Sequence, residues 1–158
     1  MINLNVTSAA FTNGAVIPTR FTGDGEDVSP PLQWTGIPTN AKELALIVDD
    51  PDAPTANPWV HWVIYKIPAT EIGLPENVAK TTALLQPVGT VQGRNSWGTT
   101  GYRGPAPPRG GGVHHYHFKL YALDKALPVG AGMDKNQLLN AISGHVLAQG
   151  ELVGTYQR

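Results

Sequence analysis

Short apolar runs alternate with glycine and proline along most of the chain, a pattern typical of short strands joined by turns. Residues 43–48 form a nearly continuous apolar run, which suits a strand buried on both faces. Residues 59–67 and 114–123 predict two further strands, and weaker strand signals lie at 3–11 and 145–156. The chain is therefore predicted to be mainly β.

One segment near the C-terminus has the pattern of a helix. Asp134 stands three residues before Gln137, which is the spacing of a capping box. Gly144 would end this helix, whose buried stripe would consist of Leu138, Leu139 and Ile142. Residues 74–80 are expected to form a short helical turn on the surface. The predicted architecture is two packed antiparallel sheets with few short helices.

Alternation within the predicted strands sorts the histidines by face. One face of strand 114–123 is apolar after its first two residues and should meet the core; it consists of His114, Tyr116, Phe118, Leu120 and Ala122. His115 and His117 fall on the wetter face. In strand 59–67 the same period groups four residues on one side, namely His61, Val63, Tyr65 and Ile67.

A long segment without any periodic pattern, residues 86–112, is rich in glycine and proline. Such a segment predicts a packed loop with a functional role. Backbone N–H groups of a glycine-rich loop can converge on one anion, and the glycines expected to form this nest are Gly104, Gly110, Gly111 and Gly112. His114 and Tyr116 follow the loop and could add donors. The alternative interpretation is a stiff surface loop that holds no ligand.

Asp50 and Asp52 end the first buried strand and are followed closely by prolines. A carboxylate at this place could orient a histidine or hold the cationic part of a ligand, or it could cap the N–H groups of a turn. Aspartates and histidines could also bind a metal ion, although the chain has no H-E-x-x-H spacing. No G-x-S-x-G motif favours a serine nucleophile. We therefore predict no metal, no other cofactor and no catalytic residue.

Composition narrows the class of protein further. A chain of 158 residues predicts one domain spanning residues 1–158. The formal net charge of −1 and the lack of Lys/Arg runs argue against nucleic acid as a partner. The absence of cysteine excludes disulfides and thiolate chemistry. We find neither an apolar run of membrane-spanning length nor a signal-peptide pattern, and we expect a cytoplasmic protein.

Two spaced motifs resemble the signatures of the phosphatidylethanolamine-binding proteins, also called Raf kinase inhibitor proteins. The first is DPDAP at residues 50–54, followed by HW at residues 61–62. The second is GPAPPRG at residues 104–110, followed by H-x-Y at residues 114–116. The segments FTGDGEDVSPPLQW and GHVLAQGELVGTYQR are also similar to the small bacterial and archaeal branch of the family. The resemblance therefore covers nearly the whole chain.

This resemblance implies a large central antiparallel sheet packed with a smaller sheet, and one small pocket for phosphate-like anions and phosphorylated head groups. The matching positions imply a set of ligand-binding residues, which are Asp50, Asp52, Pro54, His61, Gly104, Pro107, His114 and Tyr116. The chain departs from the family at His115, where the family usually has arginine. It also lacks the long C-terminal helix of the animal members, which puts kinase regulation in doubt.

The leading hypothesis is a protein that binds small phosphate-like anions or phospholipid head groups and is not an enzyme. The resemblance also allows an inhibitor of a kinase or serine protease that acts through protein contact, and it allows a homodimer. A third hypothesis is a weak phosphoester or ester hydrolase, in which Asp50 would work with His61 or His114 as acid and base.

Overall fold

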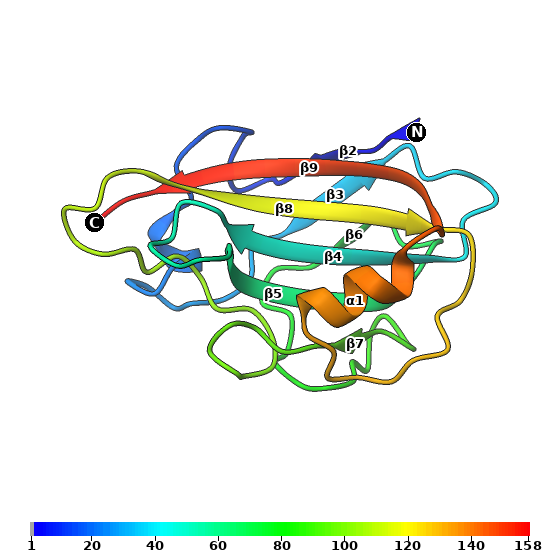
Figure 1. Cartoon of the computed structure of the whole chain (residues 1–158). Coiled ribbons are helices and arrows are strands. Elements are labelled where there is room, and N and C mark those ends of the chain that lie inside the picture. Colours follow the sequence, from blue (N-terminus) through cyan, green and yellow to red (C-terminus); the bar gives the residue numbers. More distant parts are fainter. Residues whose placement is uncertain (1) are drawn as a thin grey trace.

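The computed structural model describes residues 2–158 and consists mainly of strands (Figure 1). The strands of the large sheet are β1 (Ile2–Asn3), β4 (Glu43–Asp50), β5 (Trp59–Pro68), β7 (Val91–Gln92), β8 (His114–Leu123) and β9 (Val146–Tyr156). The small sheet contains β2 (Asn5–Thr7), β3 (Leu32–Thr35) and β6 (Gly73–Leu74). The helical elements are the 3-10 turn η1 (Thr19–Phe21) and the helix α1 (Lys135–Ile142).

The large sheet has the strand order β1-β9-β8-β4-β5-β7, and the small sheet has the order β2-β3-β6. This arrangement confirms the predicted mainly β fold with a large and a smaller sheet. The large sheet is mixed, because β1 pairs with β9 in parallel while its other pairs are antiparallel. The predicted strand at 3–11 is divided at Leu4, whose N–H donates to Gln149 O at 2.9 Å, so that its two parts join different sheets.

Two apolar layers lie on the two faces of the large sheet. One cluster fills the space between the two sheets and includes Trp34, Trp62 and Phe118. The other cluster joins the opposite face to α1 through Leu138 and Ile142. Figure 1 shows α1 beside β4 and β5, at a distance from the end of the sheet where β8 begins. The pocket described below lies on the face away from α1.

The predicted helix is confirmed together with its capping box, since Asp134 accepts from the Gln137 N–H and the Gln137 side chain accepts from the Asp134 N–H. The helical turn predicted at 74–80 was wrong. This segment contains the end of β6 and then irregular backbone. Its N–H groups at Asn77 and Val78 donate to Ser29 O and Ser29 Oγ, and these tertiary bonds replace the helical ones. None of the helices in the described residues is long and apolar enough to cross a membrane.

Candidate functional site

A β-bulge in β5 decides where His61 points. Val48 pairs with Trp62 and Asp49 pairs with Val60, which leaves His61 as the extra residue between them. The bulge turns the His61 ring toward Tyr116, with ring centroids 5.1 Å apart. The predicted grouping of His61 with Val63 was therefore wrong, because simple alternation assumes a regular ladder.

Strand β8 alternates regularly and places the side chains of His114 and Tyr116 on the face where the His61 ring lies. His114 and Tyr116 are buried, with 4% and 1% of their surfaces exposed, and their rings stack at 6.5 Å. His115 and His117 lie on the other face and are exposed and half-buried, respectively. The predicted division of the histidines on this strand is confirmed.

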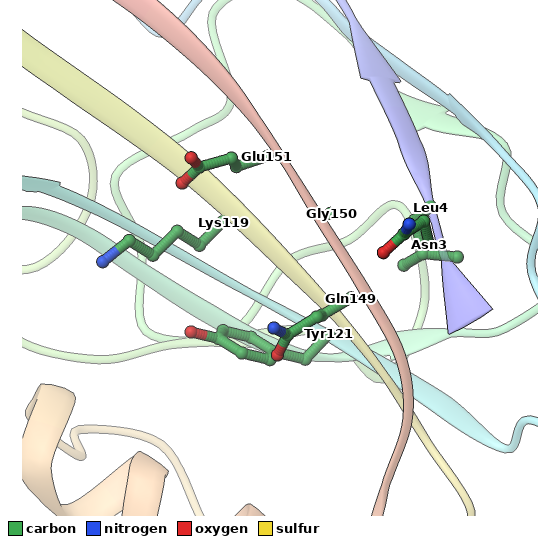
Figure 2. Close-up of a pocket in the computed structure, with 7 residues that line it drawn as sticks. All are labelled: Asn3, Leu4, Lys119, Tyr121, Gln149, Gly150 and Glu151. Atoms are coloured by element: carbon green, nitrogen blue, oxygen red, sulfur yellow. The ribbon is translucent and has the colours of Figure 1, made fainter. Parts of the chain in front are cut away.

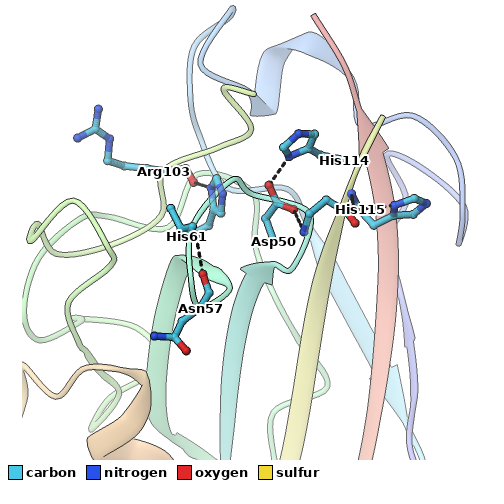
Figure 3. Close-up of polar contacts among 8 residues, drawn as sticks. Asp50, Asn57, His61, Arg103, His114 and His115 are labelled. Atoms are coloured by element: carbon cyan, nitrogen blue, oxygen red, sulfur yellow. Dashed lines mark hydrogen bonds and ion pairs between the residues drawn. The ribbon is translucent and has the colours of Figure 1, made fainter. Parts of the chain in front are cut away.

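Asp50, the last residue of β4, fixes the orientation of His114. Its Oδ2 lies 2.6 Å from His114 Nδ1 (Figure 3). Its Oδ1 accepts from the Asp52 N–H at 2.8 Å. A carboxylate in this position holds the proton of the neutral imidazole on Nδ1, which leaves Nε2 as the ring atom available to a ligand. Both Asp50 and His114 are nearly inaccessible to solvent, so the pair is rigid.

His61 is held in a different way, by a backbone carbonyl. Its Nδ1 donates to Arg103 O at 2.6 Å (Figure 3). Burial lowers the pKa of His61, and this effect outweighs the opposing influence of the Arg103 carbonyl and of the Asp50 charge. The ring is therefore neutral at pH 7. Trp97 packs against its edge at 5.0 Å and is itself covered by the Arg103 guanidinium at 4.5 Å.

Tyr116 supplies a phenol that stays protonated. Burial, followed by the charge of Asp50, raises its pKa well above the usual value. Among residues 2–158, no group forms a hydrogen bond to the Tyr116 hydroxyl, to His61 Nε2 or to His114 Nε2. All three atoms remain open rather than sealed in the core, and their residues line one pocket.

This pocket has a volume of about 270 Å³ and lies between the ends of β4, β5 and β8. Its walls are mainly apolar and aromatic. The residues that line it are Asp50, Ala53, Pro54, Thr55, Trp59, His61, Trp97, Ala106, Pro107, Pro108, His114 and Tyr116. Six of the eight residues implied by the sequence are thus brought together.

The remaining two implied residues, Asp52 and Gly104, have other contacts. Asp52 Oδ2 accepts from the N–H of His115 at 2.7 Å and from its Nδ1 at 2.8 Å, which ties the loop after β4 to β8. Desolvation raises the pKa of Asp52, but the bonds from His115 reverse this effect and lower it. Gly104 donates to Asp27 Oδ1 at 2.6 Å and packs against the backbone of Phe21.

The predicted nest of glycine N–H groups was wrong. Gly104, Gly110 and Gly111 donate to Asp27, to Arg158 O and to Pro108 O, respectively, rather than toward the pocket. The loop instead contributes its prolines and Ala106 to the wall. Three of the four glycines thus use their N–H groups within the protein, and these groups do not converge on one anion.

Some features of the site have no signature in the sequence. The carbonyl of Arg103 could not be anticipated as the partner of His61, because every residue has a carbonyl. The same applies to Arg158, whose carbonyl accepts from the Gly110 N–H at 3.1 Å while its guanidinium pairs with Asp24 at 2.9 Å. Trp59 and Trp97 lie in the wall of the pocket, and a tryptophan in a sequence indicates a core position as readily as a pocket wall.

Known proteins share the sequence and the fold of this chain. The family model for phosphatidylethanolamine-binding proteins matches residues 7–157. The chain belongs to the phosphatidylethanolamine-binding protein family. A UPF0098 protein of Methanothermobacter thermautotrophicus is 52% identical over 98% of this chain and 99% of its own length.

Solved structures of the phosphatidylethanolamine-binding protein family have the same fold. A homologue from Chlamydia trachomatis superposes with a TM-score of 0.88 at 38% identity and covers 100% of this chain and 99% of its own. YbcL of Escherichia coli superposes with a TM-score of 0.91 at 34% identity, and each chain is covered to 99%. A carboxypeptidase Y inhibitor shares the fold alone. It is 16% identical, superposes with a TM-score of 0.51, and covers 98% of this chain and 82% of its own.

This member of the phosphatidylethanolamine-binding protein family also has a wider hollow of about 550 Å³ across β1, β8 and β9 (Figure 2). Its charged side chains already have partners, since Lys119 pairs with Asp49 and Glu151 pairs with His117. The smaller pocket is the better candidate site because it is lined by unpaired polar atoms of the buried residues His61, His114 and Tyr116, whereas the polar side chains of the hollow are exposed or half-buried. Within residues 2–158 we find no group of three or more side chains that could hold a metal ion.

Proposed function

We propose that this protein binds a small phosphate-type anion, such as inorganic phosphate or the phosphate of a phospholipid head group, in the pocket between β4, β5 and β8. The observation that carries the proposal is the set of three unpaired polar atoms, on His61, His114 and Tyr116, at one end of a pocket with apolar walls. The membership in a family named for phosphatidylethanolamine binding supports the same role.

His114 and Tyr116 are the natural donors to the anion. The phenol is protonated and donates directly. His114 donates through Nε2 when the ring carries two protons, while Asp50, 2.6 Å away on the opposite side of the ring, compensates the charge.

The walls of the pocket strengthen these hydrogen bonds. Pro54, Pro107 and Pro108 restrict the backbone, so little conformational entropy is lost when the ligand binds. Trp59 and Trp97 pack edge to face at 5.5 Å and reduce the access of water. A hydrogen bond in such surroundings is electrostatically stronger than one in water. The organic part of a head group would lie against these aromatic rings.

Binding rather than catalysis is the proposed activity. Asp50 uses both of its oxygens within the protein, so it is poorly placed to take a proton from water. Ser96 Oγ, on the loop behind Trp97, accepts from the Val60 N–H at 2.7 Å and has a structural role. Each of these groups supports the architecture of the pocket.

Calorimetric titration with inorganic phosphate tests the proposal. We expect wild-type protein to show saturable binding and His114→Ala to bind about tenfold or more weakly, because a charge-assisted hydrogen bond is lost. His145→Ala is the matched control, since His145 pairs with Asp124 outside the pocket. Equal affinity of wild type and folded His114→Ala for phosphate would overturn the assignment of the site.

A further inference from the structure

The three open polar atoms of the pocket differ in what they can offer a ligand. Tyr116 presents an O–H donor, because its phenol stays protonated. When the His114 ring carries two protons, its Nε2 also donates, and the Asp50 carboxylate at 2.6 Å compensates the charge. His61 is the exception. Its only proton is on Nδ1 and is held by the Arg103 carbonyl at 2.6 Å, so Nε2 carries a lone pair.

The surroundings of His61 keep its ring neutral, so that Nε2 remains a hydrogen-bond acceptor. Trp97 and Tyr116 pack against the ring at right angles, and its remaining exposure is 3%. The charged groups near it are the carboxylates of Asp50, Asp27 and Asp49, and their combined effect is smaller than that of burial. The side-chain charge of Arg103 lies over Trp97 instead of over the imidazole. His61 therefore acts as a hydrogen-bond acceptor at neutral pH.

We infer that this pocket selects a phosphate group that carries its own proton, as in a phosphate monoester, over a phosphate diester that has no ammonium group. This inference rests on the proposed function and specifies the ligand class of the same site. A singly protonated monoester has one P–OH to donate to His61 Nε2, and its other oxygens can accept from His114 and Tyr116. A diester has only acceptors and would place an oxygen lone pair against the lone pair of His61.

The selection works through an unsatisfied acceptor. A polar atom that becomes buried by the ligand without a partner loses its contact with water, and this loss is a strong source of discrimination. His61 Nε2 is such an atom, because it is open only toward the pocket. An ammonium group on a ligand could also donate to it. The test must therefore use ligands that lack an amine.

Ethyl phosphate and dimethyl phosphate are a matched pair of probes, because they are isomers with the same atoms and differ in having a P–OH or lacking it. At pH 6 a large share of the monoester is singly charged, since its second pKa is about 6, and the diester is singly charged as well. For wild-type protein, calorimetry should show ethyl phosphate binding about tenfold or more tightly than dimethyl phosphate.

Two variants separate the cause of this preference. His61→Gln replaces a fixed acceptor by an amide that can turn either its oxygen or its NH₂ group to the ligand, so the ratio of the two affinities should fall toward one. Tyr116→Phe removes a donor that serves both probes, so both should bind more weakly while their ratio is preserved. Thermal unfolding of each variant verifies that it is folded.

The outcomes distinguish the inference from the proposed function. Measurable and equal binding of the two isomers by wild type would overturn the selectivity and leave phosphate binding intact. A preference that persists in His61→Gln would overturn the role of His61. If neither isomer nor inorganic phosphate binds, both proposals fail. Should His61→Gln not fold, the ratio of the two wild-type affinities decides, because only ethyl phosphate loses a proton above pH ~6 and its advantage over dimethyl phosphate must then shrink. An unchanged ratio would overturn the inference.

Discussion

At the scale of single residues, the site depends on how each histidine is held. His114 is oriented by a carboxylate and His61 by a carbonyl, although both rings are nearly inaccessible. A buried carboxylate lies beside one ring, whereas the other ring faces a neutral carbonyl and has its pKa lowered by burial. Two histidines that look alike in the sequence therefore meet a ligand in different electrostatic surroundings.

The buried His61 should make the stability of the protein depend on pH. Its pKa is lowered in the folded state, so the unfolded chain takes up the proton first as the pH falls. The stability present above the unfolded pKa of about 6.5 is then lost on acidification and levels off below the folded pKa. Urea unfolding at pH 7.5 and pH 5 should show this loss in wild type and a smaller loss in His61→Gln. An identical loss in the two proteins would contradict the neutral state of His61.

Sequence patterns predicted some residues of the site and missed others for physical reasons. Alternation placed His114 and Tyr116 correctly because β8 is regular from His114 to Ala122. It misplaced His61 because a bulge in β5 depends on the pairing with β4, which a single strand does not reveal. Ile67 was misplaced for a related reason, since Lys66 before it has a φ of 54° and breaks the period.

At the scale of elements, the pocket requires that the proline-rich loop be pressed against η1. Gly104 makes this contact possible, because a Cβ at this position would collide with the backbone of Phe21 and Thr22. The N–H of Gly104 also donates to Asp27. The glycine thus serves the packing of the loop rather than the rim of the pocket.

Replacing this glycine should destabilise the protein. Gly104→Ala is expected to cost about 1–3 kcal/mol through overpacking, and each kcal/mol lowers the melting temperature by about 2–4 °C in a chain of this size. Gly130→Ala is the matched control, since a Cβ there meets no atom within 4 Å. Calorimetric melting curves of both variants provide the measurement. Equal melting temperatures would show that the loop can shift without cost.

Local signals predicted α1 but failed at 74–80. The capping box of α1 is satisfied within four residues, so the sequence contains all of its information. Segment 74–80 is directed by hydrogen bonds to Ser29, which is distant in the chain. Interactions of this kind are accessible only once the tertiary structure is known.

At the scale of the whole molecule, the large sheet separates the helix from the pocket. Leu138 of α1 is fully buried in the cluster on one face, and Tyr116 belongs to the cluster on the other. Strand period and apolar runs predicted the two-sheet architecture. The parallel pairing of β1 was not predictable, because it depends on the division of one short segment at Leu4 between two sheets.

This separation predicts that stability and binding can be changed independently. Leu138→Ala should cost about 2–5 kcal/mol of unfolding free energy, because it leaves a cavity under α1. The phosphate affinity of the folded variant should equal that of wild type, since the pocket lies on the opposite face. Chemical unfolding and calorimetry measure the two quantities. A severalfold change in affinity would contradict the independence of the two layers.

The most direct test of phosphate binding in this pocket observes the histidine side chains themselves. The chain has five histidines, and ¹⁵N-labelled histidine allows each to be followed by NMR during a titration with inorganic phosphate, with His→Gln variants for assignment. We predict saturable shifts at the Nε2 atoms of His61 and His114, with His115, His117 and His145 nearly unchanged. The absence of saturable shifts at His61 and His114, or equal shifts at all five, would contradict the account.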